Sequence, residues 1–590
     1  MRRGVGVVLT VLGAAVLLSI TGMAVAYLLL AREPPVARDS TLVLRPGGEL
    51  HEVLPNDVAG QVLRRGGTNT VRAFVELMRK AARDSRITAV VLKPGSIDLP
   101  YWGKVQELRQ AVVDFRKSGK PVVAYLEYGG DREYYLASAA DRVFLMPTSP
   151  LDLTGVASYE IFLRGTLDKI GAYPDMLHIG DYKTAPNQLT EATYTPAHRE
   201  MAESLNRDMY EQLVRGIADA RKKSEAEVRA LIDEGPFLPE DALRAGLVDD
   251  LVYEDQVDDK VKAIRKSDRM TTIDAEDYSR ISPSSVGLVP ISRVAVIYAA
   301  GTIASGKSRF DPVNGPVVGS ETLVEQIRAA RQDASIKAIV LRVDSPGGSS
   351  IASDVIWREL TITRDQKPSR PLVTSMADLA ASGGYYIGMP AQVIVAQPAT
   401  LTGSIGIFTG KIVTGGTFQK LGANVEGLSV GRRAQMNSSA RRYTPDERAK
   451  VEEQMQAFYD QFVEKAASAR HTTPEKIDAV AQGRVWTGQQ ARQHGLVDVL
   501  GGLDTAVMIA KQRAMIPADE EVELVIYPPR RTFYEMLADQ FVGATAGLGV
   551  NPLGLVLGRS EQRAIAAITA PLRLFRRGEP LALMLYAFVR

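Results

Sequence analysis

The second half of this 590-residue chain repeats the first, and this duplication limits the possible folds more than any other feature. Ile87–Leu92 matches Ile336–Leu341, and Ala245-Gly-Leu-Val-Asp249 nearly equals His494-Gly-Leu-Val-Asp498. Such matches keep their order at a nearly constant offset of about 250 residues, which is far too long for a solenoid repeat. The sequence therefore predicts two related domains in tandem.

Short apolar runs alternate with longer amphipathic stretches inside each copy. Ala338–Val343, Leu372–Met376 and Val393–Ala396 are typical of buried strands. Glu321–Gln332 and Pro445–Ser468 have the spacing of helices with one charged face. This alternation predicts α/β units with a largely parallel sheet.

The duplication also suggests where the parts of the chain begin and end. We expect the first copy at residues 51–280 and the second at residues 291–515. Residues 281–290 include SPSSVGLVP, whose Ser, Pro and Gly are typical of a linker. Residues 32–50 read as a linker that leads into a first strand. Residues 516–590 read as a C-terminal tail outside the repeat, and for this tail the sequence indicates helices but no further assignment.

The first 31 residues predict a membrane anchor. Arg2 and Arg3 precede an uncharged stretch from Gly4 to Ala31, which at 1.5 Å per residue can cross a bilayer core of about 30 Å. The apolar part of a cleaved signal peptide is usually about 7–15 residues, so the length favours an uncleaved anchor. Ala24-Val-Ala26 nevertheless resembles a cleavage site. By the positive-inside rule the arginines stay cytoplasmic and the rest lies outside.

Composition excludes several kinds of site. The chain has no cysteine, which rules out disulfides, thiolate metal sites and a cysteine nucleophile. Its formal net charge is +2, from 71 Lys and Arg against 69 Asp and Glu, so we expect no nucleic-acid partner. The 5 histidines lie outside any recognisable triad context. Nothing in the sequence implies a metal or an organic cofactor.

Two glycine-bearing segments of the second copy are candidates for chemistry. Asp344-Ser-Pro-Gly-Gly348 follows a predicted strand, and it is either an ordinary turn or a loop whose N–H groups form an oxyanion hole. Ala380-Ala-Ser-Gly-Gly384 lies between a predicted strand and a helical stretch. Ser382 in that segment is either a helix cap or a nucleophile beside the N–H of Gly383.

These segments resemble a known family. Ser345-Pro-Gly-Gly, Ala380-Ala-Ser-Gly-Gly-Tyr-Tyr and Thr400-Leu-Thr-Gly-Ser-Ile-Gly-Ile-Phe are similar to segments of signal peptide peptidase A. The duplication and the anchor resemble the long, two-repeat form of that family. The resemblance covers roughly residues 50–515 and is weaker in the first copy. It implies an α/β fold with two tandem Clp-protease/crotonase-like domains after an N-terminal transmembrane helix.

The resemblance implies a serine peptidase with a Ser–Lys dyad. Ser382 corresponds to the nucleophile of the family. Lys183, in Gly180-Asp-Tyr-Lys183, corresponds to the general base, which must be neutral to accept the proton of the serine. The pKa of such a lysine has to be lowered by several units, so we expect a largely desolvated site.

The same resemblance assigns supporting roles to four more residues. Ser404, in the Leu-Thr-Gly-Ser segment, helps to orient the lysine. The oxyanion donors are the N–H of Gly383 and one N–H from the Ser-Pro-Gly-Gly loop. For the second donor, Gly347 and Gly348 stay open as alternatives.

The two copies retain complementary parts of this site. Counted from the Tyr-Tyr pair that both copies contain, Ser382 corresponds to Asp131, and Lys183 corresponds to Ala434. A lone lysine is usually an exposed surface residue. Here each copy keeps what the other has lost, which predicts one composite site shared by both.

The resemblance further implies a membrane-bound endopeptidase that degrades remnant signal peptides and other short apolar peptides. It implies a homo-tetramer on the outer face of the bacterial cytoplasmic membrane, with a single-pass anchor. Two alternatives stay open. One is an acyl-thioester enzyme of the crotonase fold, which coenzyme A binding would support. The other is a non-catalytic membrane scaffold, which the absence of any turnover would favour.

Overall fold

The computed structural model of the protein describes residues 33–53, 70–311, 315–366 and 370–529, together with isolated N-terminal positions and the short segments 574–575, 578–584 and 588–589. The expected membrane anchor, residues 1–31, lies outside the described residues except for isolated positions. None of the helices in the described part of the chain has the length and apolar character needed to cross a membrane.

The first repeat is built on a six-stranded, wholly parallel sheet. Its strands, in spatial order, are β10 (Thr271–Asp274), β1 (Ser40–Leu44), β2 (Ile87–Leu92), β3 (Val122–Leu126), β5 (Arg142–Leu145) and β9 (Asp250–Leu251). β1 lies within the stretch that we expected to be a linker. Its five residues are all buried, so this short apolar run is part of the sheet.

The second repeat contains the same succession of parallel strands. They are β23 (Glu521–Tyr527), β11 (Pro290–Ala300), β15 (Ile336–Ser345), β17 (Leu372–Ala381), β18 (Val393–Ala396) and β22 (Val499–Leu500). Beyond β17 the sheet also carries β19 (Leu401–Gly403), which pairs antiparallel with β21 (Val485–Thr487). β23 falls in the stretch that we expected to be a tail, and it pairs with β11 as β10 pairs with β1. The α/β class with two parallel sheets is confirmed.

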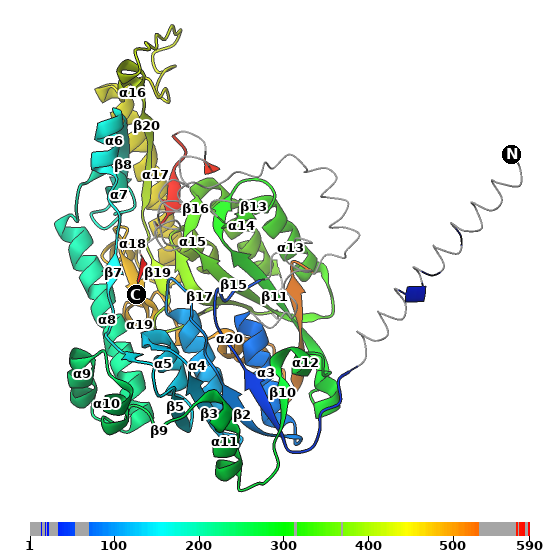
Figure 1. Ribbon diagram of the computed structural model, residues 1–590. Helices are drawn as coiled ribbons and strands as arrows, with labels where there is room; N and C mark the ends of the chain where they lie inside the picture. The colour runs from blue at the N-terminus through cyan, green and yellow to red at the C-terminus, as the bar shows by residue number, and fades with distance from the viewer. Residues whose placement is uncertain are drawn as a thin grey trace, which may run out of the picture.

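Helices surround the sheets of both repeats (Figure 1). The first repeat has α3 (Val71–Arg83), α4 (Gly103–Arg116), α5 (Asp131–Ala137), α6 (Arg164–Ile170), α7 (Asn187–Thr190), α8 (Pro196–Arg221), α9 (Glu225–Glu234), α10 (Pro239–Arg244), α11 (Val257–Arg265) and α12 (Ala275–Ser279). The second has α13 (Ser320–Gln332), α14 (Ser350–Gln366), α15 (Gly383–Gly388), α16 (Gly415–Lys420), α17 (Pro445–Ala469), α18 (Pro474–Asp478), α19 (Gly488–Gln493) and α20 (Leu503–Arg513).

The duplicated sequence motifs make equivalent contacts in both repeats. Tyr134 donates a hydrogen bond from its hydroxyl to the carbonyl of Leu247 at 2.7 Å, and Tyr385 does the same to Leu496 at 3.1 Å. In each repeated Tyr-Thr-Pro the threonine caps the long helix that follows, α8 or α17, with proline in its first turn. The matched residues therefore maintain the same architecture twice.

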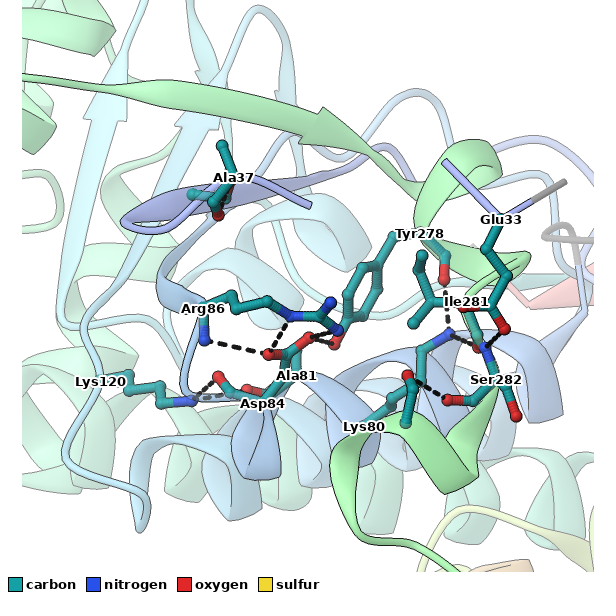
Figure 2. A network of polar contacts seen from close by, with 12 residues as sticks. Glu33, Ala37, Lys80, Ala81, Asp84, Arg86, Lys120, Tyr278, Ile281 and Ser282 are labelled. Carbon is teal, nitrogen blue, oxygen red and sulfur yellow. Dashed lines mark hydrogen bonds and ion pairs between the residues drawn. The ribbon is translucent and has the colours of Figure 1, made fainter. Parts of the chain in front are cut away.

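A network of polar contacts fastens the end of the first repeat to α3 (Figure 2). Lys80 donates to the carbonyl of Ile281 at 2.9 Å and also to the carbonyl of Tyr278. The Tyr278 hydroxyl donates to Asp84 at 3.1 Å, and the same carboxylate binds Arg86 at 2.8 Å. These contacts hold α12 and the connection to the second repeat against the first sheet.

A third sheet joins the two repeats. Its strands, in spatial order, are β13 (Arg309–Asp311), β14 (Gly315–Gly319), β12 (Thr302–Ala304), β16 (Gly347–Ser349), β24 (Leu581–Leu583), β20 (Ile407–Val413) and β8 (Tyr173–Ile179). β8 belongs to the first repeat and pairs antiparallel with β20 of the second over seven residues. In Figure 1 both strands run into the arm at the upper left, where α6 and α16 lie. This pairing brings loops of both repeats to one place.

Buried charges also connect the repeats. Arg342 on β15 binds Glu52 at 2.8 and 2.9 Å and Glu107 on α4 at 2.6 Å. All three residues are buried, and both carboxylates come from the first repeat. A buried arginine needs such partners because an unpaired charge there is costly. The triad therefore fixes how the two repeats pack.

Candidate active site

Ser382 lies at the sharp turn between β17 and α15. Its backbone has φ 55° and ψ −112°, an unusual conformation for a residue with a side chain, and its N–H donates to the carbonyl of Gly403 at 2.8 Å. Strand β17 is buried along its whole length, as expected for the apolar centre of a parallel sheet. The side chain of Ser382 is therefore held at the carboxyl end of a rigid strand.

Lys183 reaches the same place from the first repeat. It follows β8 after the turn at Gly180 (φ 90°), and it is almost completely buried. The backbone of the second repeat comes very close to it, since a β-carbon added to Gly483 would lie 2.4 Å from the Cα of Lys183. Glycine at position 483 therefore permits the contact that positions the lysine.

Three oxygen atoms surround the amine of Lys183. Its Nζ lies 2.8 Å from Ser382 Oγ, 3.0 Å from Ser404 Oγ and 3.2 Å from the carbonyl oxygen of Ser404. A neutral amine has two N–H donors and one lone pair. The two oxygens of Ser404 can accept both N–H groups, which leaves the lone pair directed at the hydroxyl of Ser382.

Burial lowers the pKa of Lys183 to about 7. Lys104 is an instructive contrast, because it is also buried but lies 2.7 Å from Asp344 and 3.8 Å from Asp378. Burial lowers the pKa of Lys104 as well, but the carboxylates of Asp344, Asp378 and Glu52 together outweigh burial and raise that pKa above its usual value. No carboxylate contributes to the shift at Lys183. Its environment therefore favours the neutral amine.

The two glycine segments meet beside Ser382. Gly347, with φ 94°, is so close to the helix start that a β-carbon added to it would lie 2.5 Å from the backbone nitrogen of Gly383. The N–H of Gly347 donates to the hydroxyl of Ser345 at 3.1 Å. Gly348 follows in β16 and is paired with Ile303 of β12. The structure thus brings together all six site residues that the sequence indicated.

A cavity opens next to the dyad and is lined by both repeats. Lys183 and Ser404 lie on its wall. Its apolar part is formed by Met201, Leu401 and Val485, and Met584 of the C-terminal segment packs against these three residues. Such a cavity beside a serine and a neutral lysine can accept an apolar side chain of a peptide.

The position of the first repeat that corresponds to Ser382 has no nucleophilic side chain. Asp131 stands there, and its carboxylate accepts hydrogen bonds from the backbone N–H groups of Thr154 and Gly155, both at 2.9 Å. This carboxylate stabilises the turn of the first repeat by contacts that the serine does not make. Within the described residues, no group of three His, Asp or Glu side chains is arranged to hold a metal ion.

Sequence reasoning missed the ion cluster behind the nucleophile. Besides its ion pair with Lys104, Asp378 accepts a hydrogen bond from the Lys104 backbone N–H at 2.7 Å, and burial raises the pKa of this carboxyl to about 6. The available signal was the position of Asp344 and Asp378 in the last four residues of the two strands that lead to Gly347 and Gly383. Charges at such buried positions indicate a partner from another element.

The chain is similar to known serine proteases along most of its length. The model of peptidase family S49 matches the chain twice, at residues 114–267 and 364–516. The chloroplastic serine protease SPPA of Arabidopsis thaliana is 36% identical over 488 residues, 82% of this chain and 71% of that protein. Protease 4 of Salmonella typhi is 34% identical over 495 residues, 81% of this chain and 77% of that protein. A putative signal peptide peptidase SppA of Enterococcus faecium is 31% identical over 187 residues, 32% of this chain and 54% of that protein.

Proposed function

Since the chain belongs to peptidase family S49 and is therefore a serine peptidase, we propose that Ser382 is its nucleophile and Lys183 its general base. The observation that carries this proposal is the distance of 2.8 Å between Lys183 Nζ and Ser382 Oγ, in a buried site where the pKa of the lysine is about 7. A serine hydroxyl needs a base of this kind to attack a carbonyl.

In the proposed mechanism Lys183 removes the proton of Ser382 as Oγ attacks the peptide carbonyl. The N–H of Gly383 and an N–H of the loop at Gly347 and Gly348 stabilise the oxyanion. Protonated Lys183 then donates its proton to the leaving amine, and a water activated by the same lysine hydrolyses the acyl-enzyme. Ser404 keeps the amine oriented through the contacts at 3.0 and 3.2 Å.

As substrates we propose remnant signal peptides and other short apolar peptides. The apolar wall of the cavity, with Met201, Leu401 and Val485, supports this choice. The name of the Enterococcus faecium relative, a putative signal peptide peptidase, is consistent with it. We further propose that each repeat has the Clp-protease/crotonase-like fold, and that residues 1–31 anchor the enzyme in the bacterial cytoplasmic membrane with its catalytic part outside.

We also propose assembly into a homo-tetramer. In support, the segment after α16 exposes large apolar side chains, with Leu421 77%, Leu428 103% and Val430 100% exposed. When the repeats are aligned on their Tyr-Tyr pairs, this segment corresponds to β8 of the first repeat. β8 is covered because it pairs with β20 of the second repeat. We propose that another copy of the chain provides the equivalent cover.

Hydrolysis of a fluorogenic apolar peptide by the full-length protein tests the proposed dyad. Ser382→Ala and Lys183→Ala should each lose at least a thousandfold in kcat. Lys117→Ala is the control, since the side chain of Lys117 is 72% exposed, and it should keep the parent activity. Full activity in Lys183→Ala would show that another group is the base.

A further inference from the structure

A segment near the C-terminus occupies the edge of the proposed active site as an added β-strand. β24 lies between β16 and β20, beside β16 in Figure 1. It runs antiparallel to β16 with Gly347 opposite Leu583 and Ser349 opposite Leu581. On its other side Leu581 pairs with Phe408 of β20. β24 is therefore enclosed between β16, which contains Gly347 and Gly348 of the site, and β20, which joins the two repeats.

The backbone of this segment contacts the glycines of the site. The N–H of Met584 donates to the carbonyl of Pro346 at 2.8 Å. The carbonyl oxygen of Ala582 lies against both glycine segments, since a β-carbon added to Gly347 would be 2.1 Å from it and one added to Gly383 would be 3.0 Å from it. The peptide thus lies against the two glycine segments that we propose as the source of the oxyanion donors.

The side chains of the segment fill apolar sites on alternate sides. Leu581 and Leu583 pack with Ala185 and Phe408. Met584 enters the cavity beside the dyad and packs against residues of both repeats. The three side chains are only 5%, 3% and 8% exposed, in chain order.

Polar contacts hold the start of the segment. The Glu579 carboxylate accepts a hydrogen bond from the hydroxyl of Ser349, and the Glu579 carbonyl accepts one from Thr409 at 2.9 Å. The Pro580 carbonyl accepts a hydrogen bond from the hydroxyl of Ser350 at 2.8 Å. Backbone pairing along a sheet edge, combined with pockets for alternate side chains, is a recurring way in which proteins bind extended peptides.

We propose that residues 579–584 are a built-in, substrate-like strand that occupies the peptide-binding cleft and competes with substrates. The proposal rests on the proposed function of the same site. It also defines the substrate class more closely: the cleft accepts an extended peptide with leucine-sized side chains at two alternate positions, followed by an unbranched apolar side chain such as methionine in the cavity.

The effect of this intramolecular competition on the apparent KM of a substrate can be calculated. A tethered segment has an effective concentration of about 1 mM, so a strand that binds its cleft with a Kd of about 0.1 mM raises the apparent KM of a substrate about tenfold. Competition leaves kcat unchanged, because substrate at saturation displaces the strand.

The experiment uses the full-length chain with Leu583→Asp and Met584→Asp combined, which places two charges in apolar sites. The apparent KM for a fluorogenic peptide should fall about tenfold at unchanged kcat. Leu238→Asp with Met515→Asp is the matched control, because these side chains are 65% and 93% exposed, and its KM should equal that of the parent. An unchanged KM in the double variant, or a lower kcat at the same KM, would overturn the proposal.

A binding measurement separates this proposal from the proposed catalytic function. A fluorescent peptide with the sequence of residues 578–584 is titrated into Ser382→Ala protein with and without the two tail substitutions. Fluorescence anisotropy should give about tenfold tighter binding when the tail is displaced. Equal affinities would refute the built-in competitor even if the dyad is correct, whereas tighter binding would support it even if Ser382 is not the nucleophile.

Discussion

The pH dependence of peptide hydrolysis should report the ionisation of one buried lysine. Burial lowers the pKa of Lys183 from 10.5 to about 7, and only its neutral form can accept the proton of Ser382. Below pH 7 a growing fraction of the amine is protonated, so the activity falls as the pH is lowered. Above pH 7 the amine is neutral, so kcat/KM rises with pH and then reaches a plateau.

The size of the effect follows from the neutral fraction of the amine. With a pKa of about 7 this fraction is about 1% at pH 5, about 50% at pH 7 and about 90% at pH 8. We therefore expect kcat/KM to fall about 50-fold from pH 7 to pH 5, and to rise less than about twofold from pH 7 to pH 8. A lysine with an ordinary pKa would instead give about a tenfold rise per pH unit up to pH 9.

The assay is a pH–rate profile of the full-length protein in detergent with a peptide that has no ionisable group. Samples held at pH 5 and returned to pH 7 must recover full activity, which excludes unfolding as the cause of the loss. Lys183→Arg should be inactive at every pH tested, because a guanidinium stays protonated. A flat profile between pH 5 and pH 8, or a rise that continues tenfold per unit to pH 9, would refute the assignment of Lys183.

Two further predictions concern the surroundings of the dyad. Ser404→Ala removes the hydroxyl 3.0 Å from Lys183 Nζ but keeps the carbonyl contact, so kcat should fall about tenfold to a hundredfold with little change in KM, as steady-state kinetics would show. Arg342→Met leaves two buried carboxylates without their partner and should destabilise the fold by about 3–5 kcal/mol in denaturant titration. Lys117 is the control for the second prediction, because its side chain and that of its partner Asp114 are 72% and 51% exposed, and Lys117→Ala should change stability by less than about 1 kcal/mol.

The order of helices and strands was predictable because the same motifs and apolar runs occur in the same order in both copies. Tyr194-Thr-Pro196 and Tyr443-Thr-Pro445 begin the long helices α8 and α17, and the matched apolar runs form the matched strands. The short edge strands were harder to predict. β1 and β23 are recognised as strands only through their pairing with neighbours that are distant in sequence.

The site could be anticipated only in part. Ser382 and its glycines lie in one recognisable segment, but Lys183 is 199 residues away and reaches it through the pairing of β8 with β20. Asp131 replaces the serine in the first copy and Ala434 replaces the lysine in the second. This complementary loss was the only signal within the sequence that connected Ser382 with Lys183. The expected anchor at residues 1–31 stays a prediction.

The C-terminal strand could not be placed from the sequence at all. Leu581–Leu583 is too short for a periodic pattern, and its alternation is visible only once its neighbours are known. The pockets that accept it are assembled from both repeats, so no local segment carries the signal.

The central claim is that Lys183 of the first repeat activates Ser382 of the second. Labelling with a fluorophosphonate, followed by mass spectrometry of the modified peptide, tests it most directly because the reagent reports the activated hydroxyl itself. We predict a single adduct on Ser382 in the parent protein and a loss of labelling of at least a hundredfold in Lys183→Met. An adduct on another residue, or equal labelling of Ser382 in Lys183→Met, would contradict the account.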